Sequence, residues 1–195
     1  MKTVFTVCVI LLFAVTLDAQ NFAKKGVWEL GGSAGFSSST SVFNGETAEE
    51  SATTFMLAPY LGYFVVNSFE LGLIPSFVSQ SFGDNYSASS FGVYFAPAWN
   101  FDLQSNLFPF IEGRIGYNTA TTTVTDDEGV EQEFSASGLA WGLRGGVKVQ
   151  VGNSGLVNLA LFYDQITMDP DNWDGDRNGE NVFGITAGFT IFWGR

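Results

Sequence analysis

Apolar and polar residues alternate with a period of two along most of the chain after residue 26. In the first such segment Trp28, Leu30 and Phe36 fall on one face. Glu29 and Ser33 fall on the other face. This pattern is typical of a β-strand whose two faces meet different surroundings, and helical spacing is not evident. The alternation returns at residues 55–65, 69–81, 91–101, 111–119, 139–151, 157–165 and 182–193. The sequence therefore predicts eight strands of about 9 to 13 residues.

The segments between these strands alternate in length. Long connections are expected at residues 38–53, 83–89, 120–133 and 168–180, and short ones at 66–68, 102–106 and 152–155. If successive strands are antiparallel neighbours, the long loops lie on one rim, and the short turns and both termini lie on the other. The prediction is an all-β fold, an eight-stranded antiparallel up-and-down transmembrane β-barrel, which closes without leaving a strand edge.

The two strand faces differ in side-chain size, and this difference predicts their orientation. One face carries large apolar residues, for example Trp28, Phe95 and Trp141, whereas the other is rich in small residues such as Gly72 and Gly116. The interior of an eight-stranded barrel is narrow, so the small face is expected inside and the large face toward lipid. Aromatic residues also gather near the short-turn strand ends, where rings favour a membrane interface. These are Phe64, Phe69, Trp99, Phe101, Phe108 and Trp193.

Charge gives the same orientation. The ionisable residues within the predicted strands all lie on the small-residue face, and they are Glu29, Glu70, Glu112, Arg114, Arg144, Lys148 and Asp164. An Arg or Lys that faces the middle of a bilayer costs about 2 to 4 kcal/mol, so these groups are expected inside. All of them except Asp164 are expected to form a salt-bridge network in the half of the lumen nearer the short turns. The network either fills and rigidifies the lumen or acts as a gate.

The first 19 residues differ from the rest and are expected to be a signal peptide. Lys2 is followed by an apolar run at residues 4–15, which is too short to span a bilayer. Cleavage is expected after Ala19 or Gln20, which leaves residues 20–195 as the barrel domain; a buried first strand or a retained anchor is the alternative. Cys8 lies in the leader, so the mature chain has no cysteine.

Composition limits the chemistry that the chain can perform. A net charge of −12 without a basic patch argues against nucleic-acid binding. There is no histidine, so no cofactor and no enzymatic activity are expected. Asp174, Asp176 and Asn178 resemble part of a calcium loop, but its twelfth position is Ile185, so a solvated loop is favoured. The acidic long loops could instead bind an extracellular ligand.

Several blocks resemble the small eight-stranded outer-membrane barrels of the OmpA/OmpX type, the porin-like "outer membrane protein beta-barrel domain". The blocks are residues 26–36, 59–65 with 69–73, 109–113 and 186–193. In the last block Thr186, Gly188, Ile191 and Trp193 look like the signal by which the insertion machinery recognises such barrels, although the chain ends in Gly194 and Arg195. The resemblance implies a monomer in the bacterial outer membrane, surrounded by its lipids, with both termini periplasmic.

Three functions remain open from the sequence. The leading hypothesis is a non-enzymatic integral barrel with a structural, adhesive or surface-interaction role, whose outward loops are contact surfaces. The first alternative is a narrow pore for small solutes. The second is a soluble, lipocalin-like ligand-binding barrel, which would need its bulky face turned inward.

Overall fold

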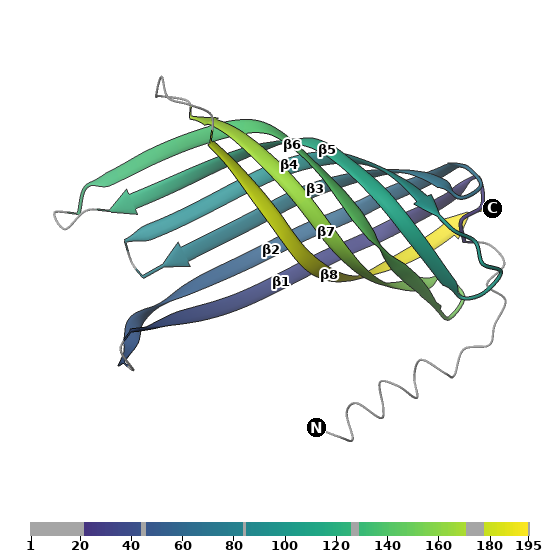
Figure 1. Cartoon of the computed structure of the whole chain (residues 1–195), viewed down its shortest axis with the longest axis horizontal. Helices are drawn as coiled ribbons and strands as arrows, with labels where there is room; N and C mark the ends of the chain where they lie inside the picture. Colours follow the sequence, from purple (N-terminus) through teal and green to yellow (C-terminus); the bar gives the residue numbers. More distant parts are fainter. Residues whose placement is uncertain (1–21, 44–45, 84, 126–128, 171–177, 195) are drawn as a thin grey trace.

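The chain folds into a closed barrel of eight antiparallel strands (Figure 1). The computed structural model describes residues 22–43, 46–83, 85–125, 129–170 and 178–194. The strands are β1 (Val27–Phe43), β2 (Glu46–Val66), β3 (Phe69–Phe82), β4 (Tyr86–Asn100), β5 (Leu107–Thr125), β6 (Glu131–Val151), β7 (Gly155–Pro170) and β8 (Asn178–Gly194). Each strand pairs with the next along the chain, and β8 pairs with β1. Within the described part, no helix is long and apolar enough to cross a bilayer. The fold class predicted from the alternation is confirmed.

The strands are longer than predicted, and the expected long loops are largely strand. β6 has 21 residues, and it pairs with β5 as far as Thr125 and Glu131, inside the predicted loop 120–133. The predicted loop 38–53 is likewise part of a ladder, which reaches Phe43 and Glu46. The strand limits were wrong because the apolar alternation disappears where both faces are polar. Pairing continues there, helped by β-branched threonines that favour extended backbone.

The predicted orientation of the two faces is confirmed. The outward Trp28, Phe95 and Trp141 are 40%, 46% and 48% exposed, whereas Glu112 is only 2% exposed. Large apolar side chains therefore cover the outside of the barrel, and the charged residues are enclosed. This is the opposite of the arrangement that a soluble, lipocalin-like barrel needs.

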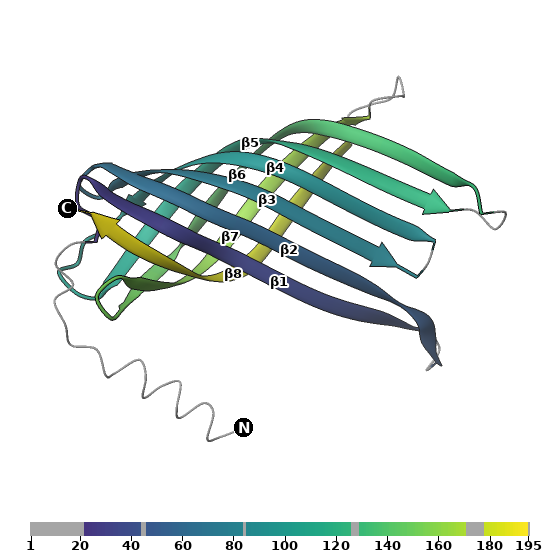
Figure 2. The same cartoon turned by 180° about the vertical axis from the view of Figure 1, so that it is seen from behind.

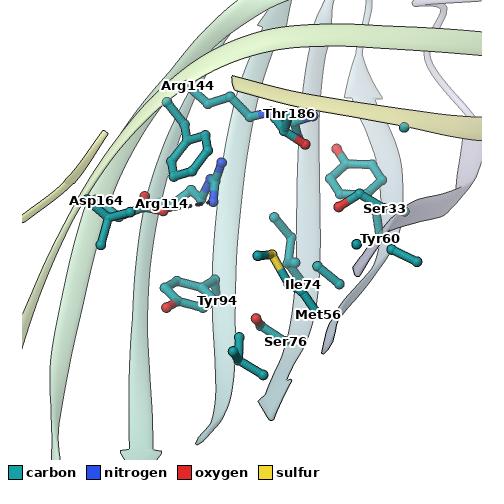
Figure 3. A pocket seen from close by; sticks show the side chains of 18 of the residues that line it. Ser33, Met56, Tyr60, Ile74, Ser76, Tyr94, Arg114, Arg144, Asp164 and Thr186 are labelled. Carbon is teal, nitrogen blue, oxygen red and sulfur yellow. Dashed lines mark hydrogen bonds and ion pairs between the residues drawn. The ribbon is translucent and has the colours of Figure 1, made fainter. Parts of the chain in front are cut away.

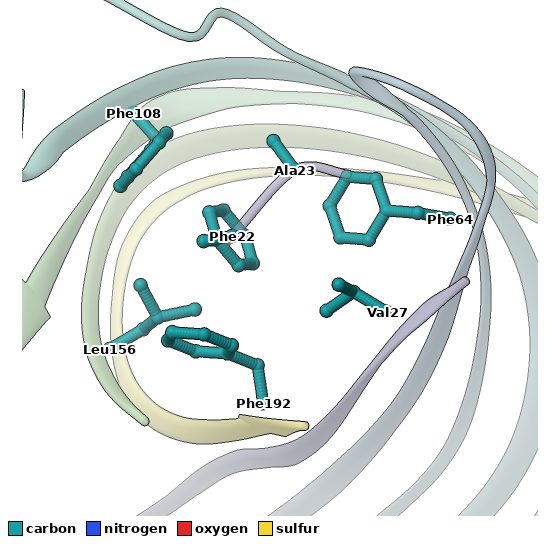
Figure 4. Close-up of a cluster of buried hydrophobic side chains, with 7 residues drawn as sticks. All are labelled: Phe22, Ala23, Val27, Phe64, Phe108, Leu156 and Phe192. Atoms are coloured by element: carbon teal, nitrogen blue, oxygen red, sulfur yellow. The ribbon is translucent and has the colours of Figure 1, made fainter. Parts of the chain in front are cut away.

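An aromatic plug closes the short-turn end of the lumen (Figure 4). The segment before β1 places Phe22 inside the barrel, where its ring centroid lies 5.2 Å from that of Phe64 and 4.8 Å from that of Phe108. The other members of the cluster are Ala23, Val27, Leu156 and Phe192. The prediction that Phe64 and Phe108 belong to an outer interface girdle is therefore wrong. Both side chains are fully buried, because their strand positions point inward.

Two backbone hydrogen bonds hold this entering segment across the barrel mouth. The amide of Gly26 donates to the carbonyl of Phe64 at 2.8 Å, and the amide of Ser68 donates to the carbonyl of Ala23 at 2.8 Å. Figure 2 shows the start of β1 beside the end of β8 at this rim, where Val27 pairs with Gly194. Both ends of the described chain therefore lie at the short-turn end.

The inward face is not composed only of small and charged residues. Tyr60, Ile74 and Tyr94 are buried in a second apolar cluster inside the barrel. Glycines make room for the rings, because a Cβ atom at Gly72 would lie 2.8 Å from the ring of Tyr60. A Cβ atom at Gly116 would lie 2.7 Å from the ring of Tyr94. Small residues predicted to line the lumen therefore serve as platforms, that is, positions without a side chain over which an inward ring can lie.

Candidate functional site

The first ionic cluster lies next to the aromatic plug inside the lumen, and Lys148 of β6 is at its centre. Its Nζ is 2.6 Å from Glu29 Oε2 on β1 and 3.1 Å from Glu70 Oε2 on β3. The other carboxylate oxygen of Glu29 accepts a hydrogen bond of 2.7 Å from Thr190, and Asn100 donates one of 3.1 Å to Glu70. One ammonium group thus connects three strands that are not neighbours in the sheet.

Three aromatic rings also surround the Lys148 ammonium. Its Nζ lies 5.2 Å from the ring centroid of Phe22, 5.5 Å from that of Tyr60 and 5.4 Å from that of Phe110. A cation at this distance from aromatic faces is attracted by their quadrupoles. The plug and the first ionic cluster are therefore one continuous obstruction across the lumen.

A second ionic cluster lies farther from the short turns, since Arg144 precedes Lys148 in β6, which ends at Val151. Figure 3 shows three of its members, Arg114, Arg144 and Asp164. Arg114 Nε is 3.1 Å from Glu112 Oε1, and Arg114 Nη1 is 3.3 Å from Asp164 Oδ2. Arg144 reaches Glu112 at only 3.7 Å through Nη1, and its buried Nε has no hydrogen-bond partner within the described chain. Its guanidinium instead lies 5.4 Å from the ring of Phe110. Arg144 therefore keeps donor capacity that the protein does not use.

A cavity of about 580 Å³ begins at these clusters and extends away from the plug. Its floor includes Arg114, Arg144 and Asp164, and its apolar wall includes Met56 and Ile74 (Figure 3). The volume lies within the range of about 300 to 1,000 Å³ that is typical of small-molecule sites. The lumen is therefore blocked at one end and hollow beyond the block.

The sequence-predicted residues fall into two groups. The six residues of the expected network are assembled in the two clusters, joined by Asp164, which the sequence placed inside but not in the network. The expected insertion signal lies in β8, where Thr186 lines the cavity and Ile191 and Trp193 face outward. Whether the insertion machinery recognises this strand stays a prediction.

The weak calcium-loop candidate cannot be placed as a unit. Asp174 and Asp176 lie outside the described residues, and Asn178 begins β8. Over the described ranges, no group of three or more His, Cys, Asp or Glu residues could hold a metal ion.

Sequence reasoning missed the aromatic part of the site. Phe22 precedes the first predicted strand, and Phe110 and Phe162 occupy inward positions that were expected to be small or polar. A signal was present, because Phe162 and Gly184 are cross-strand partners, and a Cβ atom at Gly184 would lie 2.8 Å from the ring. A large inward residue opposite a glycine is the pattern that could have identified these rings.

One exposed ion pair ties the entering segment to a turn at the short-turn rim. Lys24 Nζ donates a hydrogen bond of 2.9 Å to Asp102 Oδ2, and the amide of Gln104 donates one of 2.9 Å to Asp102 Oδ1. The hydrogen bond from Lys24, followed by that from the Gln104 amide, lowers the pKa of the Asp102 carboxyl below its usual value. The pKa of Asp102, which lies outside the lumen, therefore depends on whether Lys24 and the segment that carries the plug stay at this turn.

No protein-family model matches the chain, and no curated protein sequence matches it significantly. Solved structures do match. Neisserial surface protein A is 18% identical with a TM-score of 0.56, over 86% of this chain and 97% of that chain. The outer-membrane protein OprG from Pseudomonas aeruginosa is 13% identical with a TM-score of 0.52, over 88% of this chain and 98% of that chain.

A third match is the translocator domain of the autotransporter NalP from Neisseria meningitidis. It is 12% identical with a TM-score of 0.53, over 97% of this chain and 70% of that chain. At these identities the likeness is one of fold. The chain thus has the fold of small outer-membrane β-barrels, in agreement with the resemblance seen in its sequence blocks.

Proposed function

We propose that this protein is a non-enzymatic, integral outer-membrane β-barrel that is closed along its axis and acts through its outer rim. The observation that carries the proposal is the exposed apolar belt, defined by outward residues such as Leu30, Phe95, Leu143 and Ile191. Soluble monomers rarely expose apolar patches larger than a few hundred Å², and larger ones mark membrane or protein contacts. Burial of the strand charges inside the barrel supports a lipid surrounding.

The sharpest test of membrane insertion is a charge scan along one strand. Leu143 lies near the middle of the apolar run of β6 and is 55% exposed, whereas Val151 lies on the same face at the end of the strand and is 40% exposed. In a bilayer, Leu143→Arg is expected to lower the free energy of unfolding by about 2–4 kcal/mol, and Val151→Arg by about 0–1 kcal/mol. Urea unfolding in lipid vesicles measures both. Equal effects at the two depths would refute the membrane proposal.

Fractionation provides an independent check. The wild-type protein should remain with the membrane pellet in the absence of detergent. Its gel mobility should change only after boiling, because every strand pairs with two neighbours and unfolding must break these ladders together. Recovery in the aqueous fraction without a heat-dependent shift would favour a soluble barrel.

The main rival is a narrow pore, and the interior arrangement argues against it. Phe22 and the Lys148 cluster lie across the lumen between the short-turn end and the cavity. We therefore expect no conductance steps from the purified wild type in planar bilayers. Reproducible single-channel steps would overturn the closed-lumen proposal and favour the pore.

The outer rim is the remaining surface for contacts with partners. We place both chain ends on the periplasmic side, because the short turns lie there in this architecture. The strand ends opposite the short turns then project from the cell surface and carry exposed carboxylates, such as those of Glu131 and Glu133. This charge favours a cationic extracellular ligand or divalent cations bridging to lipid phosphates. Loss of cell-surface attachment after Glu131→Gln and Glu133→Gln would support a contact role, and unchanged attachment would count against these carboxylates.

A further inference from the structure

The barrel wall is incomplete between its first and last strands. β1 and β8 pair over six residues, from Val27↔Gly194 to Gly32↔Phe189. β1 then continues to Phe43, and β8 begins as far away as Asn178, but these parts pair only with β2 and β7. Figures 1 and 2 both show the two strands diverging toward the long-strand end. The seam is therefore closed near the short turns and open beyond Gly32.

The central cavity reaches this opening. Its lining includes Ala34 of β1 and Ala187 of β8, which lie at outward positions of their strands. Gly35 and Gly188 also line it at inward positions, so small residues stand on both edges of the seam, and Ile185 is a larger apolar residue of the lining on β8. The mouth of the cavity thus faces sideways through the wall.

The opening lies at the level of the apolar belt. Phe183 and Ile185 are 72% and 71% exposed, and both lie in the part of β8 that does not pair with β1. Open sheet edges do not face lipid directly, because unpaired backbone groups in hydrocarbon cost several kcal/mol each. Backbone at this depth is tolerated where it lines a cavity, and the lumen provides one.

The chemistry of the cavity selects its ligand. The apolar wall, with Met56 and Ile74, suits a hydrocarbon chain. The same lining carries hydroxyl side chains, among them Ser33 and Thr186, and the side chain of Arg144 (Figure 3). A hydroxyl group can donate a hydrogen bond to the first two and accept one from any of the three.

The charge of the lumen disfavours an anionic head group. The two ionic clusters contain four carboxylates and three cations, so their formal sum is −1. The members are Glu29, Glu70, Glu112 and Asp164 with Arg114, Arg144 and Lys148. A carboxylate or phosphate would add to this negative charge in a site of low dielectric constant.

We propose that the cavity binds an uncharged single-chain amphiphile with a hydroxyl head, such as a long-chain alcohol, which enters from the membrane through the open part of the β1–β8 seam. This inference rests on the proposed membrane location. The hydroxyl contacts the polar part of the lining at Thr186 and Arg144, and the chain runs along Ile74 and out between Ala34 and Ala187. The protein then binds a ligand from the membrane side, while its lumen stays closed along the barrel axis.

The test uses the full-length mature protein in nanodiscs of deuterated lipid, with 1-dodecanol as the probe. Protein–probe nuclear Overhauser effects are read at Ile74, which is 7% exposed and inward, and at Ile115, which is 58% exposed and outward. Dodecanol dissolved in the bilayer reaches only Ile115, whereas dodecanol in the cavity also reaches Ile74. We expect cross-peaks at both residues in the wild type, and a much weaker Ile74 cross-peak with dodecanoate.

A matched pair of variants tests the lateral route. A Cβ atom at Gly35 would meet only Met56 Cβ at 3.8 Å, so Gly35→Phe should fill the mouth without a backbone clash. Gly113 has no atom within 4 Å of its Cβ position and lies on β5 away from the seam, so Gly113→Phe is the control. The Ile74 cross-peak should disappear in Gly35→Phe and persist in Gly113→Phe, with heat-dependent gel mobility reporting the fold of each.

The outcomes separate the two proposals. The seam inference is overturned if the Ile74 cross-peak is absent from the wild type or is unchanged in Gly35→Phe. In either case a retained Ile115 cross-peak still supports the membrane location. Equal Ile74 cross-peaks for dodecanol and dodecanoate overturn the choice of an uncharged head. Loss of the Ile115 cross-peak together with the heat-dependent shift would instead overturn the membrane proposal itself.

Discussion

Replacing Lys148 with methionine should strongly destabilise the barrel. The substitution leaves Glu29 and Glu70 fully buried without the ammonium that lies 2.6 and 3.1 Å from their carboxylate oxygens. At an effective dielectric constant of about 20, attractions over these distances are about 6 and about 5 kcal/mol. The desolvation of Lys148 in the wild type offsets part of this energy. A net loss of about 3–5 kcal/mol is therefore expected, as for other buried pairs from which one partner is removed.

The assay is urea unfolding in lipid vesicles, followed by tryptophan fluorescence. Two variants serve as controls. Lys148→Met combined with Glu29→Gln and Glu70→Gln removes the charges together and should recover most of the loss, because no buried charge is left unpaired. Lys24→Met removes an ion pair whose lysine side chain is 43% exposed and should change stability by only about 0–1 kcal/mol. A loss below about 1 kcal/mol for Lys148→Met, or no recovery in the triple variant, would refute this reasoning.

Three further predictions concern the plug, the rim and the glycine platforms. Phe22→Ala should lower the free energy of unfolding by about 3–5 kcal/mol in the same assay, and a change near zero would show that the plug does not pack. The lowered pKa of Asp102 means that its pair with Lys24 stabilises the fold above the ordinary aspartate pKa of about 3.9, and that this contribution is lost as the pH falls through the folded value. Carboxyl NMR titration should show the Asp102 midpoint rising in Lys24→Met, and an unmoved midpoint would contradict this cause. Gly72→Ala should unfold at lower urea than the wild type, because its Cβ would lie 2.8 Å from Tyr60, whereas Gly113→Ala should be nearly neutral; similar midpoints would contradict the platform role.

The alternation of residues was sufficient to predict the barrel and its orientation. Outward Trp28 and inward Glu29 differ so much in the cost of facing lipid that only one orientation is physically acceptable. The strand ends were not predictable in this way. Around Thr121 and Ser135 the two faces are similarly polar, so the pattern carries no period although the ladder continues. The alternation of apolar and polar residues is visible only where the two faces of a strand meet different environments. Backbone pairing does not need this difference and continues beyond it.

The interior of the site was predictable only in part. Charges such as Arg144 must be enclosed and paired, which follows from their cost in lipid, but their partners depend on the barrel register. Phe22 could not be assigned to the lumen, because it belongs to no alternating segment and its place is set by hydrogen bonds of its neighbours to the rim. The seam was also hidden. The alternation in β8 is regular throughout, and nothing in it marks Phe189 as the last residue paired with β1.

The contacts of Lys148 have a mechanical consequence for the barrel. A ring of strands can flatten into an ellipse while every rung between neighbouring strands stays intact, so the ladders alone do not fix its cross-section. Lys148 resists this flattening, because it ties β6 to β1 and β3 through the middle of the ring. Lys148 thereby keeps the barrel round near the short turns. Farther along, the Arg114–Asp164 pair ties only β5 to β7, so that half is freer to adapt its outline to the pressure of its surroundings.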